Sequence, residues 1–347
     1  MESGRPGLRR DHRVSAERRL RILLSARAAQ QLRGPIAKLL DGRPHVLVEP
    51  GQPEGVDVAF VSRDVTGLST KHELQPATRS FYDTLEQSGD LRWVHVHSAG
   101  ADRPVYLRLR QRGVQVTTSS GTNAAVVAQT AVAAVLALGR RFPQLMRAQR
   151  ERRWAPLIGS TLPRDIQGQH AVVVGWGPIG QEIGRLLLAL GLRLTVVRHG
   201  ATPAGAAIHT VPYQDLHQVL PTADWLLLAC PLSEITRGLV DAGAIERLPA
   251  GAHLVNVARG EVVDEQALIA ALQSGRLAGA FLDVFAHEPL PPESPLWSMD
   301  NVIATPHSAG FSDGNETRVA RLFLDNLGRW LDGTPLVNVA GEASPAS

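Results

Sequence analysis

The chain has 347 residues, of which 44% are hydrophobic, and this length predicts two domains rather than one. Its 36 basic and 33 acidic side chains leave a net charge of +3, and the absence of a basic stripe interleaved with aromatic residues argues against nucleic-acid binding. A single cysteine excludes a disulfide framework, and no apolar run reaches the roughly 18 residues of a membrane span, so we expect a cytoplasmic protein.

The first 19 residues are rich in arginine and lack the apolar core of a secretory signal, so we expect a disordered extension. Apolar runs that predict strands then alternate with the helical patterns of 28–41 and 78–89. The five expected strands are 20–26, 45–50, 57–63, 91–98 and 114–120. Strands that alternate with helices predict a doubly wound parallel sheet.

An alanine-rich apolar helix is expected over 123–141, and residues 142–169, rich in Arg and Pro, are expected to form an irregular excursion. The strand and helix alternation then restarts with six candidate strands, the number of a full dinucleotide-binding domain. These strands are 170–177, 192–199, 223–231, 252–260, 279–285 and 301–307. A last helix, 316–333, leads back. We therefore expect a cofactor domain of residues 121–311, inserted into a substrate domain of 20–120 and 312–347.

The first of these six strands runs into three glycines, Gly175, Gly177 and Gly180, in the spacing G-x-G-x-x-G. The first glycine allows a tight bend, the second a close approach of a pyrophosphate, and the third close packing of helix on strand. The helix that follows begins with Pro178, which has no N–H to leave unsatisfied, and points its positive end at the phosphates. Because a strand precedes this turn and a helix follows it, the turn predicts a dinucleotide site.

The next strand ends in Arg198 and His199, where an NAD-binding fold carries an acid for the ribose 2′-hydroxyl. An arginine cannot accept that hydrogen bond but can pair with a 2′-phosphate. We therefore expect NADP as the preferred cofactor, with His199 as an accessory. The alternative is a solvated arginine in an enzyme that uses NAD as well.

Three later strands each lead to a polar residue, namely Arg259, Glu288 and His307. Ligands of open α/β sheets bind beyond the carboxyl ends of the strands, so these side chains are expected to converge on a bound nicotinamide. Taken singly, each could be an ordinary surface or turn residue. Only two lysines exist, Lys38 and Lys71, and the chain has neither a Tyr-x-x-x-Lys pair nor a P-loop.

Together with "ACPLSEITRGLV" (229–240) and "SAGAD" (98–102), these fragments resemble the D-isomer-specific 2-hydroxyacid dehydrogenases, and within them the glyoxylate/hydroxypyruvate reductases. The resemblance covers most of 90–340. It implies a Rossmann cofactor domain, a flavodoxin-like substrate domain, a homodimer and a small 2-oxo or 2-hydroxy acid as substrate. The family's Glu-His pair is replaced here by Gln129-Thr130, which leaves the role of that helix open.

The resemblance also implies roles for single residues. Arg259 would bind the substrate's carboxylate and carbonyl oxygen, His307 would act as general acid and base, and Glu288 would orient His307. The substrate would further contact the loop residues Ser98, Ala99, Gly100 and Ala101. The cofactor would be held by Gly175, Gly177, Pro178, Ile179, Gly180, Arg198, His199, Cys230, Pro231, Thr236, Val257, Ala258 and Asp283, the last at the nicotinamide carboxamide.

Other interpretations are considered beside this one. A nicotinamide-sensing protein or corepressor could keep the same fold, and a formate-type dehydrogenase is disfavoured because that group carries Gln where Glu288 stands. His95 and His97 lie two residues apart, but without an obvious third ligand we expect no metal site. Trp154, in the irregular excursion, is expected at a subunit contact or over the substrate.

Overall fold

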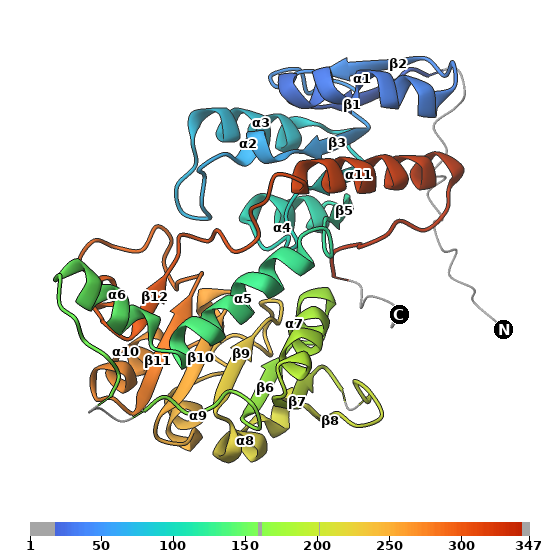
Figure 1. Cartoon of the computed structure of the whole chain (residues 1–347). Coiled ribbons are helices and arrows are strands. Elements are labelled where there is room, and N and C mark those ends of the chain that lie inside the picture. Colours follow the sequence, from blue (N-terminus) through green and yellow to red (C-terminus); the bar gives the residue numbers. More distant parts are fainter. Residues whose placement is uncertain (1–17, 159–161, 201, 342–347) are drawn as a thin grey trace. The chain divides into compact units, whose positions relative to one another are not determined.

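The computed structural model describes residues 18–158, 162–200 and 202–341 (Figure 1). Two units follow from the internal contacts: the chain up to Thr122 with the part from Gly314 onward, and Asn123–Asp313. Each unit is a parallel sheet with helices on both faces, which confirms the predicted fold class. The predicted extension, residues 1–19, lies outside the described residues except for its last two.

The first unit holds a five-stranded parallel sheet in the order β2-β1-β3-β4-β5, the order of flavodoxin-like folds. Its strands are β1 (Leu20–Leu23), β2 (His45–Val48), β3 (Val58–Val61), β4 (Trp93–Val96) and β5 (Gln115–Thr118). All five lie inside the ranges expected from the sequence. Each observed strand is shorter than its apolar run, because the flanking residues turn into loops.

Successive residues of these strands point to opposite faces, so the unit has two apolar cores. Ile22 and Phe60 pack with α1 (Ala26–Leu40) and α11 (Asn315–Asp332), whereas Leu23 and Val61 pack on the other face with α3 (Pro76–Gln87) and α4 (Pro104–Gln111). The short α2 (Arg63–Thr66) follows β3. Helix α11 thus brings the end of the chain back onto the first sheet, as the helix predicted over 316–333 requires (Figure 1).

The second unit holds a seven-stranded parallel sheet in the order β12-β11-β10-β9-β6-β7-β8. Its strands are β6 (His170–Val174), β7 (Arg193–Arg198), β8 (His209–Pro212), β9 (Trp225–Leu228), β10 (Ala252–Asn256), β11 (Leu277–Leu282) and β12 (Val302–Ala304). The order reverses between β6 and β9, which is the point where such sheets bind ligands. The six predicted strands are present. The edge strand β8 was not predicted, because it buries only Val211 and ends in a proline.

The helices of this unit cover both faces of the sheet (Figure 1). They are α5 (Ala124–Gly139), α6 (Phe142–Arg150), α7 (Pro178–Ala189), α8 (Leu216–Val219), α9 (Ala242–Arg247) and α10 (Glu265–Gln273). Helices α5 and α7 share a core with Ala171 and Val173, while α8, α9 and α10 share the other with Val172 and Val174. Single turns of 3-10 helix lie at 213–215, 220–222, 260–262 and 295–297.

The excursion predicted over 142–169 begins with the helix α6, which the sequence pattern did not single out. Pro143 stands in the first turn of α6, where the backbone N–H that proline lacks would have no partner in the helix. The apolar residues of α6 share one face. No single described helix is long and apolar enough to cross a membrane. Helices α5 and α6 meet the length and composition criteria only as a pair, bent by 70°.

Candidate active site

The glycine-rich turn lies at the carboxyl end of β6, in contact with the loop that follows β9. Gly175 has φ +100°, and a Cβ there would lie 2.5 Å from the backbone nitrogen of Cys230. At Gly180, the first turn of α7, a Cβ would lie 2.0 Å from the carbonyl oxygen of Gly175. Contacts within the protein therefore require glycine at both positions. They hold α7 against the strand, as the spacing predicts.

Gly177 differs from the other two, because apart from its chain neighbours no heavy atom of the described residues lies within 4 Å of the position its Cβ would take. It is the N-cap of α7 and makes no side-chain capping bond, and Pro178 is the first helical residue. The first amides of α7 thus face a space that neither a side chain nor a cap fills. This cradle fits a pyrophosphate, which would accept hydrogen bonds from these amides and sit at the positive end of the helix.

Arg198 is the last residue of β7 and is paired in register with Pro212 of β8. Its guanidinium is half-buried and makes no hydrogen bond or ion pair with another described residue. Its charge reaches the neighbouring Tyr213, where burial raises the pKa of the phenol and the arginine partly offsets that rise. The exposed His199 follows. Neither strand-end residue is an acid, and the preference for a 2′-phosphate at this position stays a prediction.

The loop after β9 begins at Cys230 and Pro231 and closes on itself. Thr236 donates a hydrogen bond to the carbonyl of Pro231 at 2.6 Å and accepts one from the amide of Ser233 at 2.8 Å. Burial raises the pKa of the Cys230 thiol to about 12, so this thiol is a packed apolar group rather than a nucleophile. The Thr236 hydroxyl shapes the loop, and its direct contact with a cofactor stays a prediction.

The segment after β10 carries Arg259, with Val257 and Ala258 buried before it. Asn256 holds this segment, since its amide accepts from the N–H of Ala258 at 3.0 Å and donates to the carbonyl of Arg259 at 3.1 Å. Asn256 was not among the residues predicted from the sequence. The feature that could have identified it is a polar amide side chain at the end of β10.

Arg259 lies against the loop that carries Glu288. The next residue is Gly260, where a Cβ would lie 1.9 Å from the backbone carbon of Phe285, so the two segments touch backbone to backbone. The charge of Arg259 acts on both Glu288 and Cys230, and in each case it lowers the pKa of the acidic group. The guanidinium is thus close enough for its charge to act on the loops that follow β9 and β11.

Glu288 and His307 form the central pair of the site. The Nδ1 atom of His307 lies 2.9 Å from Oε2 of Glu288, and Oε1 accepts from the amide of Phe285 at 3.2 Å. Burial alone would raise the pKa of Glu288. The hydrogen bond and charge of His307, the Phe285 amide and the Arg259 charge outweigh burial and lower it. The carboxylate is therefore ionised, and its Nδ1 contact leaves Nε2 of the imidazole for other partners.

Asp283 lies directly after β11 with a nearly fully buried carboxylate, and its hydrogen bonds go to the turn that carries His307. It accepts from the hydroxyl of Thr305 and the amide of Ser308, both at 2.7 Å, and from the amide of Ala309 at 3.1 Å. Burial raises its pKa, and these donors lower it in part. Asp283 therefore organises the His307 turn, and the predicted contact with a nicotinamide carboxamide stays a prediction.

The predicted substrate loop belongs to the first unit, after β4. The carbonyl of Ser98 accepts a hydrogen bond from the amide of Ser119 at 2.9 Å. The hydroxyl of Ser98 donates a hydrogen bond to the carbonyl of Gly100 at 2.6 Å. This hydroxyl closes the turn through Ala99, Gly100 and Ala101, all of which are half-buried. The predicted catalytic residues and all of the predicted cofactor residues come from the second unit, most of them at the carboxyl edge of its sheet.

His95 and His97, on β4 and directly after it, have separate partners. His95 is fully buried between the hydroxyls of Thr117, 2.8 Å away, and Ser119, 3.1 Å away, whereas His97 lies 2.8 Å from the hydroxyl of Thr66. Burial lowers the pKa of both imidazoles to about 3. For His97, nearby positive charges add to the effect of burial. The described residues contain no group of three or more potential side-chain ligands for a metal ion.

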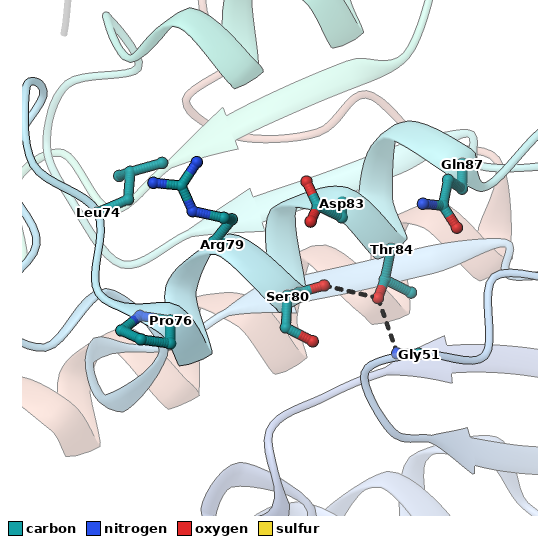
Figure 2. A pocket seen from close by; sticks show the side chains of 8 residues that line it. All are labelled: Gly51, Leu74, Pro76, Arg79, Ser80, Asp83, Thr84 and Gln87. Atoms are coloured by element: carbon teal, nitrogen blue, oxygen red, sulfur yellow. Dashed lines mark hydrogen bonds between the residues drawn. The ribbon is translucent and has the colours of Figure 1, made fainter.

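One open groove of about 490 Å³ runs along α3 in the first unit (Figure 2). Thr84 accepts the amide of Gly51 at 2.8 Å and donates to the carbonyl of Ser80, which joins the loop after β2 to the helix. None of the predicted site residues lines it. The lining residues are Gly51, Leu74, Pro76, Arg79, Ser80, Asp83, Thr84 and Gln87.

Comparison with known families places the second unit among dehydrogenases. Residues 132–309 match the family model described as D-isomer specific 2-hydroxyacid dehydrogenase, NAD binding domain. The chain is 32% identical over 252 residues to a glyoxylate reductase of Korarchaeum cryptofilum. The aligned region covers 71% of this chain and 74% of that protein. The chain is also 34% identical over 251 residues to a glyoxylate/hydroxypyruvate reductase B of Klebsiella pneumoniae, and the aligned region covers 72% of this chain and 78% of that protein.

A solved structure is similar over almost the whole chain. It is a D-isomer specific 2-hydroxyacid dehydrogenase from Xanthobacter autotrophicus Py2, in complex with NADPH and MES. The likeness has a TM-score of 0.73 and 30% identity, and it covers 92% of this chain and 97% of the other. It therefore extends to the first unit, where the sequence resemblance was weakest.

Proposed function

Because the chain belongs to the D-isomer specific 2-hydroxyacid dehydrogenase family, we propose that it reduces a small 2-oxo acid, of the glyoxylate or hydroxypyruvate type, to the D-2-hydroxy acid. Membership of this family makes the chain an NAD(P)-dependent oxidoreductase. The observation that carries the residue assignment is the 2.9 Å contact between His307 and Glu288, in a loop that touches the Arg259 segment.

The chain's residues divide the work as follows. Arg259 binds the carboxylate and the carbonyl oxygen of the substrate, for which its planar set of donors is suited. The backbone amides of the loop Ser98–Ala101, in the first unit, are a further set of donors that suits a carboxylate. The reduced nicotinamide, when bound, supplies the hydride that reaches the carbonyl carbon. His307 donates a proton from Nε2 to the carbonyl oxygen, which completes the hydroxyl group.

Glu288 serves this proton transfer through its charge. Its carboxylate stabilises the protonated imidazole before the transfer and fixes the ring through Nδ1, so Nε2 is the nitrogen that carries the transferable proton. In the direction of oxidation the neutral imidazole accepts the hydroxyl proton at the same atom. Cys230 takes no part, because its pKa of about 12 keeps the thiol protonated.

The cofactor is NADP, on two grounds. Arg198 stands where an acid would bind the ribose of NAD, and the relative from Xanthobacter autotrophicus is described in complex with NADPH. Replacing Arg198 by Ala should lower kcat/KM for NADPH by about 10- to 100-fold, the range of a charge-assisted contact, and leave that for NADH within a factor of about two. A wild-type preference for NADH would refute this assignment.

The active form is a homodimer. Its contact includes the segment from α6 onward, where Trp154 has 95% of its surface exposed and Ile158 has 84%. Apolar side chains this exposed are covered in many proteins by a second subunit. Replacing Trp154 by Ser should shift the chain toward the monomer in sedimentation experiments. A wild-type chain that sediments as a monomer would contradict the proposal.

The activity is tested by screening 2-oxo acids with NADPH and NADH and following the loss of the reduced nicotinamide. Turnover of glyoxylate or hydroxypyruvate to the D-product is expected. Tight cofactor binding without turnover of any 2-oxo acid would instead favour a protein that senses the nicotinamide pool.

A further inference from the structure

His307 adopts a backbone conformation that its own side chain does not favour. Its φ is +51°, in the left-handed region, where a residue with a Cβ stays only if its surroundings hold it. The amide of His307 donates to the carbonyl of Asp283 at 2.8 Å, and the Asp283 carboxylate binds the next two amides. These bonds fix the backbone around His307 from the side of β11.

A second support comes from α5, on the other side of this turn. The hydroxyl of Thr130 lies 3.2 Å from the carbonyl oxygen of Ala309 and 3.1 Å from that of Val126 in its own helix, so its proton is shared between them. Ala309 is therefore bound at both its amide, by Asp283, and its carbonyl, by Thr130. Its side chain is buried as well.

The packing around this contact leaves the turn no room to move toward α5. At Gly310, a Cβ would lie 2.4 Å from the side-chain nitrogen of Asn123, at the start of α5. The same position is 3.4 Å from a methyl group of Val127. Helix α5 is itself fixed, since Ala128, Ala131 and Val135 are fully buried in the core of the second unit.

We propose that Thr130 is a positioning residue for the proposed general acid His307, acting through the carbonyl of Ala309. The supporting observation is the 3.2 Å contact between the hydroxyl of Thr130 and the carbonyl oxygen of Ala309. Loss of its hydroxyl frees the Ala309 carbonyl and lets the imidazole sample orientations away from the substrate. This role rests on the proposed function of His307, but the hydrogen bond itself can be tested without activity.

The test compares Thr130→Val, which keeps the side-chain shape without the hydroxyl, with Thr130→Ser, which keeps the hydroxyl. For Thr130→Val we expect kcat to fall by about 3- to 10-fold, the range for one neutral hydrogen bond, with KM for the 2-oxo acid and the Kd of the cofactor unchanged. Thr130→Ser should restore kcat to within about twofold. Thr130→Ala, suited to an alanine-rich helix, is a second variant with the same expected loss. Gln129→Ala, at the exposed neighbouring position, is the matched control and should have no effect.

A second measurement uses the protein without cofactor or substrate. Hydrogen exchange at the amides of Ser308 and Ala309 should be about 3- to 10-fold faster in Thr130→Val than in the wild type, and unchanged in Thr130→Ser. Unchanged exchange and unchanged kcat in Thr130→Val would overturn the proposal. A wild type that turns over no 2-oxo acid would count against the proposed function, and the exchange rates would still decide whether Thr130 holds the turn.

Discussion

Replacing Glu288 by Gln removes the negative charge of the proposed proton-transfer pair together with the bond that Oε1 accepts from the amide of Phe285 at 3.2 Å, because an amide nitrogen cannot accept it. The amide oxygen of glutamine can still accept from Nδ1 of His307, 2.9 Å away, and the side-chain volume is almost the same. The attraction between the carboxylate and the protonated imidazole is also lost. The variant therefore tests the charge of Glu288 while the bond to Nδ1 of His307 can be kept.

The size of this attraction follows from the geometry. Two unit charges about 4 Å apart interact by roughly 4 kcal/mol at an effective dielectric constant of about 20. Solvent screening reduces this, because the imidazole side chain is 47% exposed although the Glu288 side chain is only 18% exposed. A remaining effect of about 1.5–2 kcal/mol corresponds to a loss of roughly 10- to 30-fold in kcat at neutral pH.

The assay is steady-state reduction of the best 2-oxo acid at saturating cofactor. The matched control is Glu265→Gln, because the Glu265 carboxylate accepts from the amide of Ala286 in the same loop at 2.9 Å without touching the imidazole. We expect the control to stay within about twofold of the wild type. Wild-type kcat in Glu288→Gln, or an equal loss in Glu265→Gln, would refute the reasoning.

Three further predictions concern the acid, the glycine turn and acid stability. Replacing His307 by Asn should lower kcat by about 10²- to 10⁴-fold while cofactor binding, measured by fluorescence titration, is unchanged; undiminished turnover would place the general acid elsewhere. Replacing Gly180 by Ala forces a Cβ to within 2.0 Å of a backbone oxygen and should cost about 1–3 kcal/mol of unfolding free energy, whereas Gly34→Ala, whose Cβ would meet no described atom within 4 Å beyond its chain neighbours and its own helix backbone, should be neutral or stabilising. Equal melting temperatures of the two variants would contradict this. The pKa of buried His95 falls from 6.5 to about 3 on folding. The contribution of the neutral imidazole to the free energy of unfolding is therefore complete above pH 6.5 and is lost as the pH falls toward 3. Urea unfolding at pH 5 should thus show a loss of about 2 kcal/mol from this residue, and His95→Gln should flatten the pH dependence; an unchanged slope would argue against a neutral buried imidazole.

The sequence predicted the parts of the fold that depend on local pattern. Continuous apolar runs such as 171–174 are typical of strands buried on both faces of a parallel sheet, and the spacing of Gly175, Gly177 and Gly180 specifies how strand meets helix. Strand β8 lacks such a run because, at the edge of the sheet, it buries a single valine. Helix α6 was missed because its charged residues conceal a short amphipathic pattern.

The candidate site was predictable as a set of residues, but its supports were not. The contact of His307 with Glu288 follows once both are assigned to neighbouring strand ends. The left-handed turn at His307, the buried carboxylate of Asp283 and the hydroxyl of Thr130 depend on residues far apart in the chain. Such bonds have no signature in local sequence, because they form only when a helix and a sheet edge meet.

The discontinuous first unit has a consequence for the order in which the chain is synthesised. Phe323 of α11 stacks on Phe60, with ring centroids 4.6 Å apart, and on Trp93 at 5.6 Å. Until α11 has been synthesised, Phe60 and Trp93 lack the packing contact with Phe323. Residues 123–313, in contrast, already contain every strand of the second sheet. The nascent chain can therefore complete its second unit first and carries an unfinished apolar surface until its last helix arrives.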